Sequence, residues 1–143
     1  MVDKWSLGVF ASIDAGLGVH LDVVRELGIG TVHLHSPEGR SRTPQRAEEF
    51  ARQLKQLGVA VTCVFAGFEG ESYASIPVVK ETVGLVPAAT RSARLRELRE
   101  IADFAGMLDV RAVGLHLGFV PHAADEETYA DVVAAARAAC DFC

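Results

Sequence analysis

A weak internal repeat constrains the fold of this chain more than any other feature. In three segments, the end of a helical pattern is followed by a short apolar run. Each segment begins with a leucine and ends, eight residues later, on a side chain that carries a ring. These segments are 27–35, 57–65 and 108–116, ending on His35, Phe65 and His116, and a further run, Trp5–Phe10, also ends on a ring. Short runs rich in β-branched residues are typical of strands. The sequence therefore predicts four strands.

Amphipathic helical patterns lie between and after these runs. Their apolar stripes are Leu17, Leu21, Val24 and Leu27; Phe50, Leu54 and Leu57; Leu95, Leu98, Ala102 and Ala105; and, from about Glu126, Tyr129, Val133, Ala136 and Cys140. Gly28 and Gly58 are expected C-caps, Thr43-Pro44 an expected helix start, and Thr90 the expected cap of the third helix. Strands that alternate with helices predict parallel pairing through right-handed crossovers.

The two faces of the predicted strands differ in chemistry. One face is aliphatic and consists of Leu7, Val9, Ala11, Val32, Leu34, Val113, Leu115 and Leu117. The other mixes small, polar and ring side chains: Ser6, Gly8, Phe10, Ser12, Thr31, His33, His35, Ala112, Gly114, His116 and Gly118. A doubly wound sheet needs aliphatic residues on both faces, whereas a mixed inner face suits a barrel with its site at the mouth.

The predicted fold class is therefore α/β, the N-terminal half of a TIM (β/α)8 barrel. Four βα units in 143 residues are half of a barrel of about 250 residues. We expect one partial domain over residues 1–143, with strands one to four and helices one to four. The last apolar stripe reaches Cys143 without a C-cap, so we expect the barrel to be cut in or near its fourth helix.

Composition excludes several classes of function. The chain has 14 Lys and Arg against 19 Asp and Glu, a net charge of −5, which disfavours a nucleic-acid partner. It has no run of about 18 apolar residues, so we expect no membrane span, and its N-terminus lacks a secretory signal. Three cysteines, an odd number without framework spacing, indicate a reducing compartment. We expect a cytoplasmic protein.

Four segments carry a resemblance to a known family: Leu7–Phe10, Phe65–Glu71, Thr82–Pro87 and Leu115–Pro121. Together they resemble the sugar phosphate isomerase/epimerase group of xylose isomerase-like TIM barrels, over essentially the whole chain. The resemblance implies a divalent metal (Mn, Mg, Co or Zn) held by Glu, Asp, His and Glu of strands five to eight. It also implies that the two glutamates move a proton beside a sugar carbonyl. Those strands are not in this sequence, so no catalytic residue or metal ligand is assigned within it.

Candidate substrate contacts are the residues expected near the carboxyl ends of the strands, where TIM-barrel sites are built. His116, between Gly114 and Gly118, could hydrogen-bond a sugar hydroxyl or, when neutral, bind a metal; the alternative is a histidine bonded to a neighbouring loop. His35 holds the equivalent position on the second strand. His33 lies one layer deeper on the same face. The two histidines are either a metal-binding pair or, as we favour, polar filling of the barrel or substrate contacts.

Aromatic residues and one long loop complete the candidate site. Phe10 and Phe65 end the first and third strands and either stack on the sugar or belong to the core. The segment Ala66–Ala89, with Glu69, Glu71 and Tyr73, is predicted to be a loop. Loops of this length are usually functional. It is either a lid with hinges at Gly67 and Gly70 or a solvated insertion against a partner subunit.

Other patterns have simpler explanations. Arg91, Arg94, Arg96 and Arg99 alternate with Glu97 and Glu100, which is typical of a solvated, salt-bridged helix face. Cys140-x-x-Cys143 has no second pair, so we interpret its spacing as coincidence. His20 and His122 are expected on the surface.

The leading hypothesis is an N-terminal part of a metal-dependent sugar or sugar-phosphate isomerase or epimerase of carbohydrate metabolism. Its partner is a small sugar or sugar phosphate, with a homo-oligomer left open, and the fragment alone is expected to lack metal and activity. One alternative is a metal-dependent phosphoesterase or apurinic endonuclease. His116 matches that branch's fourth-strand histidine, but Phe65 stands where its third-strand histidine is expected. The other alternative is a non-enzymatic half-barrel or flavodoxin-like binding module.

Overall fold

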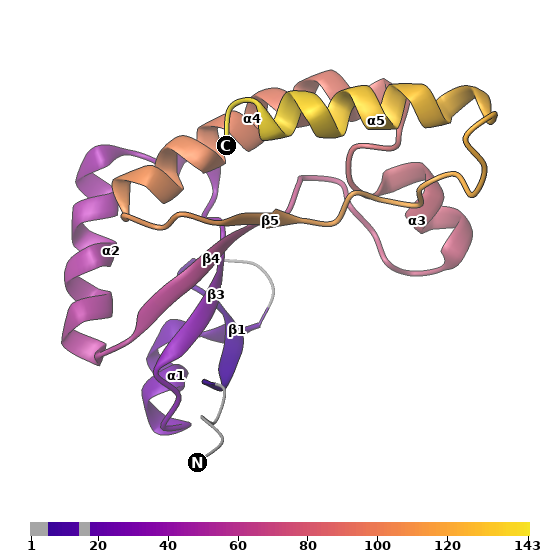
Figure 1. The fold of residues 1–143 in the computed structure, drawn as a ribbon. Coiled ribbons are helices and arrows are strands. Elements are labelled where there is room, and N and C mark those ends of the chain that lie inside the picture. The colour runs from indigo at the N-terminus through magenta and orange to yellow at the C-terminus, as the bar shows by residue number, and fades with distance from the viewer. Residues whose placement is uncertain (1–5, 15–17) are drawn as a thin grey trace, which may run out of the picture. The chain divides into compact units, whose positions relative to one another are not determined.

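A computed structural model describes residues 6–14 and 18–143 (Figure 1). Five strands, five α-helices and one 3-10 turn make up this part of the chain. In chain order they are β1 (Gly8–Ser12), β2 (Val19–His20), α1 (Leu21–Glu26), β3 (Thr31–His35), a 3-10 turn (Gly39–Ser41), α2 (Pro44–Leu57), β4 (Ala60–Ala66), α3 (Ile76–Thr82), α4 (Ala88–Met107), β5 (Val113–Leu115) and α5 (Glu127–Cys140).

The strands form one sheet in the order β2-β1-β3-β4-β5. β1 pairs in parallel with β2 and β3, and β3 pairs in parallel with β4. Phe10 lies opposite His33, and His35 lies opposite Phe65. The amide of Val64 donates to the carbonyl of Ala112 at 2.9 Å, just before β5. The parallel α/β class predicted from the alternating pattern is confirmed.

The chain folds into two compact units. The first comprises the described residues up to Phe65 together with Asp103–Gly114, and the second comprises Ala66–Ala102 together with Leu115–Cys143. Most of the sheet belongs to the first unit, with α1, α2 and the last turn of α4. The second unit holds α3, α5 and the greater part of α4. Each unit has its own candidate site residues.

Two helices cover one face of the sheet in the first unit (Figure 1). The core there consists of Ala11, Leu21, Val24, Val32, Leu54 and Val59. A second cluster forms where Phe50 of α2 meets Phe104 of α4, with ring centres 6.1 Å apart. The aliphatic face predicted for β3 is therefore confirmed. The predictions for Leu7 and Leu27 are wrong, because these side chains are 75% and 51% exposed; Leu17 lies outside the described residues.

The boundaries of α2 follow directly from its end residues. The Thr43 hydroxyl accepts a hydrogen bond from the amide of Arg46 at 3.3 Å, and Pro44 occupies the first turn, where a missing N–H costs nothing. Gly58 ends the helix at φ 67°, the left-handed conformation that glycine adopts without strain. The start and stop signals predicted here are confirmed.

Several predicted boundaries shift in the structure. The first strand spans Gly8–Ser12 rather than Trp5–Phe10, so Phe10 lies in its middle, and Trp5 is outside the described residues. β2 was not predicted, since a two-residue strand leaves no periodic pattern. The segment Ala66–Ala89 is not one loop, because it contains α3. Pro77 in the first turn of α3 was a start signal that the prediction missed.

The buried faces of the last two helices also differ from prediction. α4 begins at Ala88, before the expected cap Thr90, and its buried side chains are Arg94, Leu98, Ile101, Phe104 and Ala105. In α5 the buried residues are Val132, Ala135 and Ala139. The predicted stripe of Tyr129, Val133, Ala136 and Cys140 is offset by one residue, a rotation of about 100°. Alanine-rich helices give a weak pattern, so this error has a simple origin.

α4 and α5 run side by side in the same direction within the second unit (Figure 1). Near their amino ends, the Arg91 guanidinium contacts the Asp131 carboxylate at 3.1 Å. Near the carboxyl end of α5, the guanidinium of Arg99 lies 5.5 Å from the centre of the Phe142 ring. No helix of the described residues is long and apolar enough to cross a bilayer.

Candidate functional site

Ring side chains gather on the sheet face opposite α1 and α2. Phe10 is at their centre, with its ring 5.4 Å from His33 and 5.2 Å from Phe65, both in edge-to-face geometry. The His35 and Phe65 rings lie 6.4 Å apart. Edge-to-face pairs of this kind stabilise an aromatic cluster beyond the area that they bury. The inward orientation predicted for His33 and His35 agrees with these contacts.

A bulge in β4 adds to this face. Val32 pairs with Val61, but His33 pairs with Cys63, so Thr62 is an extra residue in β4. The Thr62 hydroxyl donates to the carbonyl of Val32 at 3.1 Å. Bulges bend a strand and redirect its side chains, and they occur often beside active sites.

Cys63 lies against Gly114 of β5. A Cβ added to Gly114 would come within 3.1 Å of the Cys63 sulfur and 3.4 Å of the Phe65 ring. Glycine at this position therefore gives the inner side chains room. Burial raises the pKa of the Cys63 thiol, outweighing a hydrogen bond from the Gly114 backbone that lowers it. A buried thiol that stays protonated is a poor nucleophile.

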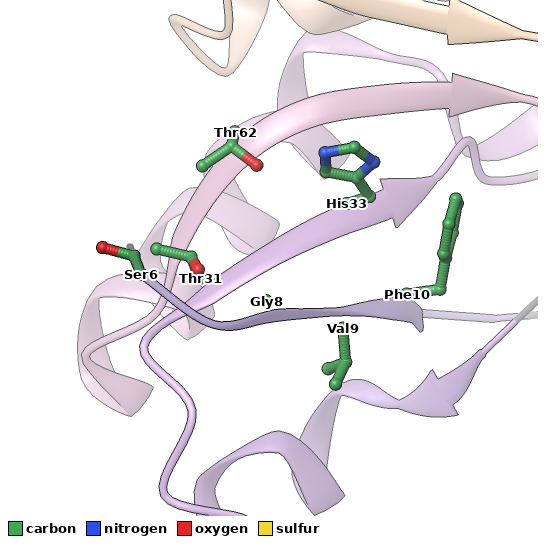
Figure 2. A pocket seen from close by; sticks show the side chains of 7 residues that line it. All are labelled: Ser6, Gly8, Val9, Phe10, Thr31, His33 and Thr62. Carbon is green, nitrogen blue, oxygen red and sulfur yellow. The ribbon is translucent and has the colours of Figure 1, made fainter. Parts of the chain in front are cut away.

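A pocket of about 430 Å³ lies on the same face, lined by Ser6, Gly8, Val9, Phe10, Thr31, His33 and Thr62 (Figure 2). Figure 2 shows the side chains of Thr31, His33 and Thr62 on one side of the strands and Val9 on the other. The pocket lies toward the amino ends of β1 and β3, away from the carboxyl ends where TIM-barrel sites are built. Only Phe10 belongs both to this pocket and to the predicted substrate contacts.

At the carboxyl end of β3 the His35 ring is held by the backbone. Its Nδ1 atom lies 3.1 Å from the carbonyl oxygen of Ser36. A carbonyl can only accept, so Nδ1 donates and the neutral ring keeps its lone pair on Nε2. Ser36 in turn is fixed, because its amide donates to the Phe65 carbonyl at 2.8 Å and its hydroxyl accepts from Arg42 at 3.1 Å. This geometry makes His35 a hydrogen-bond acceptor toward a ligand.

The second unit brings Tyr73 and His116 together. The Tyr73 hydroxyl lies 2.7 Å from His116 Nδ1, and the rings meet edge to face with centres 5.6 Å apart. His116 directly follows β5, just beyond the strand in which it was predicted, and both side chains are exposed. Burial, and then the nearby negative charge of Glu71, raise the pKa of Tyr73, while Arg94 lowers it. The phenol is therefore neutral at physiological pH.

Glu71 ties its own loop to the segment after α3. Its carboxylate accepts from the amide of Phe68 at 3.3 Å and from that of Gly84 at 2.7 Å. Glu69, by contrast, is exposed. Charge-assisted bonds to two backbone amides fix a side chain strongly. Glu71 is thus held by the fold, and contact with substrate remains a prediction for both glutamates.

Two arginines of α4 support these loops and were misjudged from sequence. Arg94 is only 4% exposed, and its guanidinium donates to the carbonyls of Thr82 and Gly84, each at 2.7 Å. Arg91 donates to the carbonyls of Leu85 and Val86 as well as to Asp131. Arg94 and Arg91 are therefore not part of a solvated face. A usable signal existed, since Arg94 shares a helical stripe with the buried Leu98 and Ile101.

The described residues do not offer a metal ion a suitable set of donors. Across residues 6–14 and 18–143, no three His, Cys, Asp or Glu side chains converge in a way that would hold one. Nδ1 of His116 is occupied by Tyr73, and His33 contacts a phenyl ring rather than a carboxylate. Zinc sites use three or four protein ligands. The donor set of the described residues therefore does not fit a resident zinc ion.

The predicted site residues thus fall into two sets. Phe10, His35 and Phe65 form one cluster within the first unit. Tyr73 and His116 touch in the second unit, where Glu71 is anchored beside Tyr73, and Glu69 contributes no contact to either set. A parallel sheet with one aliphatic face and one face of rings and hydroxyls defines the class: part of an α/β barrel with a candidate small-molecule site.

Comparison with known proteins identifies the family. The model of the Xylose isomerase-like TIM barrel family matches residues 21–143, and the chain belongs to this family. It is similar to the crystal structure of a xylose isomerase domain protein from Planctomyces limnophilus, at 42% identity and a TM-score of 0.88, over 99% of this chain and 52% of that one. No curated protein matches the sequence significantly.

A second solved structure agrees on the fold. It is a protein from Rhodospirillum rubrum ATCC 11170 that bears a provisional xylose isomerase name, with 18% identity and a TM-score of 0.56. The match covers 82% of this chain and 40% of that one. The chain therefore spans about half the length of the solved structures that it matches. The expected fold class, a partial xylose isomerase-like barrel, is confirmed.

Proposed function

We propose that these residues form part of a sugar or sugar-phosphate isomerase or epimerase, which transfers a proton at a carbon next to a carbonyl. The observation that carries the proposal is the cluster that Phe10, in the middle of β1, forms with His35 and Phe65 near the carboxyl ends of β3 and β4. A ring beside a fixed hydrogen-bond acceptor suits a sugar, which offers both C–H faces and hydroxyls. The 42% identical relative named as a xylose isomerase domain protein supports it.

Each set of residues has a defined part in this proposal. Phe10, 39% exposed, offers apolar surface to the sugar, and the buried Phe65, 8% exposed, packs against its ring. His35 Nε2 accepts a hydrogen bond from a sugar hydroxyl, since its Nδ1 is held by the Ser36 carbonyl. These groups bind and orient the substrate; proton transfer belongs to residues outside this chain, and family members often use a divalent metal.

The proposed setting is a cytoplasmic protein that acts on a small sugar. All three cysteines, Cys63, Cys140 and Cys143, are free thiols, as is typical of a reducing compartment. The excess of acidic over basic residues supports a small-molecule partner over a nucleic acid. A homo-oligomer stays a prediction.

The test follows hydrogen exchange catalysed by the full-length protein. Aldoses, ketoses and their phosphates are incubated in D2O, and deuterium at the carbon beside the carbonyl is measured by NMR. We expect exchange with at least one sugar. In the His35→Ala variant we expect kcat/KM to fall at least tenfold. A tenfold loss corresponds to about 1.4 kcal/mol of transition-state stabilisation, which is the size expected for one hydrogen bond.

The matched control is His122→Ala. His122 is an exposed histidine that contacts Phe119 and is not one of the proposed substrate-binding residues. It should keep the wild-type kcat/KM. A wild-type protein that exchanges no hydrogen in any sugar of the panel would overturn the proposal. Equal loss in both variants would remove His35 from the substrate site.

A further inference from the structure

Arg42 holds the two residues on either side of the carbonyl that contacts His35. Its Nε–H donates to the Ser36 hydroxyl oxygen at 3.1 Å and to the Pro37 carbonyl oxygen at 2.8 Å, a three-centre hydrogen bond. The Ser36 hydroxyl donates its own proton to the same Pro37 carbonyl at 3.2 Å. A guanidinium can only donate and a carbonyl can only accept, so the direction of each bond is determined.

The Ser36 carbonyl lies between these anchored groups. Its peptide plane runs from the Cα atom of Ser36 to that of Pro37, so Arg42 restrains the chain at both ends of that plane. The ring of Pro37, which is fully buried, fixes its own φ at about −65° and limits ψ of Ser36. The Ser36 amide donates to the Phe65 carbonyl of β4 at 2.8 Å. The direction of the Ser36 carbonyl is therefore set from both sides.

The backbone of Arg42 is itself held in place. Its amide donates to the Gly39 carbonyl at 3.1 Å and closes the 3-10 turn Gly39–Ser41. The next residue, Thr43, caps α2. The half-buried Arg42 side chain thus extends from a fixed junction between the turn and the helix, and it can orient its acceptors rather than follow them.

These contacts reach the candidate site through His35. Its Nδ1 atom lies 3.1 Å from the Ser36 carbonyl oxygen, which can only accept, so Nδ1 carries the proton of the neutral ring. We propose that Arg42 is a positioning residue, whose Nε–H directs the Ser36 carbonyl at His35 and so keeps His35 Nε2 as a hydrogen-bond acceptor. The ligand class that this fits is a neutral hydroxyl donor, such as a sugar hydroxyl. The identity of that ligand rests on the proposed function, whereas the role of Arg42 rests on the contacts within this chain.

A matched pair of variants isolates the Nε–H of Arg42. Glutamine has its amide group as many bonds from Cα as the Nε of arginine, so Arg42→Gln keeps an N–H donor there. Arg42→Met has a methyl group at that position and no donor. Both variants lose the rest of the guanidinium, so the difference between them reports on the Nε–H bond alone.

The first test measures the tautomer of His35 without substrate. Full-length protein with 15N-labelled histidine is examined at a pH where the ring is neutral, by long-range 1H–15N correlation, with His35 assigned from the spectrum of His35→Gln. We expect the Nδ1–H form in the wild-type protein and in Arg42→Gln, and a shift toward the Nε2–H form in Arg42→Met. An Nε2–H ring in the wild-type protein, or equal tautomer ratios in the two Arg42 variants, would overturn the proposal.

Two further variants complete this test. Ser36→Ala removes one acceptor of the three-centre bond but keeps the carbonyl, and it should shift the tautomer in the same direction by less. If circular dichroism shows that Arg42→Met does not fold, an unchanged tautomer in Ser36→Ala overturns the proposal in its place. The control is Arg40→Met, because the Arg40 side chain is 84% exposed and pairs with Glu38; it should leave the His35 signals unchanged.

Kinetics provides the second test. Arg42→Met should lower kcat/KM roughly fivefold, the loss of about 1 kcal/mol, and should have no further effect in a His35→Ala background. If the wild-type protein turns over no sugar while Arg42→Met shifts the tautomer, the proposed function fails and the positioning role stands. If sugars react but Arg42→Met leaves tautomer and rate unchanged, the positioning role fails alone.

Discussion

At the scale of single residues, Arg94 shows how a charge can be structural. A guanidinium is rarely buried unless it is paired, and Arg94 is paired with the backbone carbonyls of Thr82 and Gly84 instead of a carboxylate. Its guanidinium also lies 5.5 Å from the centre of the Phe68 ring, a cation–π distance. These contacts join α4 to the two loop segments that hold Glu71.

We predict that Arg94→Met lowers the free energy of unfolding by about 2–4 kcal/mol. Methionine has a similar length but leaves two carbonyls without donors, and each buried acceptor left unsatisfied costs about 1–3 kcal/mol. Urea unfolding of the full-length protein, followed by circular dichroism, measures the change. Arg96→Met, on the exposed side of α4, should stay within about 0.5 kcal/mol of wild type. Equal effects would contradict the structural role of Arg94.

At the scale of elements, the sequence predicts best where local chemistry decides the outcome. Thr43, Pro44 and Gly58 define α2 from either end, because capping depends on only a few neighbouring residues. The face of α5 is a different case, since its run of alanines leaves several stripes nearly equal in hydrophobicity. Val132 rather than Val133 is buried there because of packing with distant segments, which no local pattern contains.

A second element, the segment from Thr82 to Pro87, was predicted only as loop. Its structure depends on backbone contacts with Leu117 and on Gly84 at φ 70°, and such long-range contacts leave no periodic pattern. Gly118, at φ 107°, is equally close-packed, since a Cβ there would fall 2.4 Å from the Val83 carbonyl oxygen. The two glycines are therefore needed for the two loops to approach each other.

We predict that Gly84→Ala destabilises the protein by at least about 2 kcal/mol, because the new Cβ overlaps backbone atoms that cannot move independently and the φ value is strained. It should also disturb the NMR signals of His116. The control is Gly106→Ala in α4, where an added Cβ meets nothing within 4 Å. That change should stabilise the helix by about 0.5 kcal/mol. Thermal unfolding of both variants, with a lower midpoint only for Gly84→Ala, checks the prediction.

At the scale of the whole molecule, the alternation of side chains along the strands predicted the class of fold and one half of the candidate site. In β3, the aliphatic side chains of Val32 and Leu34 alternate with the imidazoles of His33 and His35. This alternation was enough to distinguish the face covered by helices from the inner face. The pairing of Tyr73 with His116 was beyond sequence reasoning, because the two residues lie 43 positions apart. The same is true of the Thr62 bulge, which depends on register between strands.

The last prediction concerns metal in the full-length protein. His116 is the residue that an endonuclease-like ligand set would use, yet its Nδ1 is bonded to Tyr73, and no cluster of three donors exists among the described residues. We therefore expect His116→Ala to keep the wild-type content of divalent metal per chain, measured by inductively coupled plasma mass spectrometry after dialysis, while its kcat/KM falls at least tenfold. His122→Ala should change neither quantity. Loss of metal in His116→Ala but not in His122→Ala would instead make His116 a metal ligand, in a set completed by residues outside the chain. That result would favour the phosphoesterase alternative over the isomerase, because a histidine that only contacts sugar hydroxyls does not hold an ion.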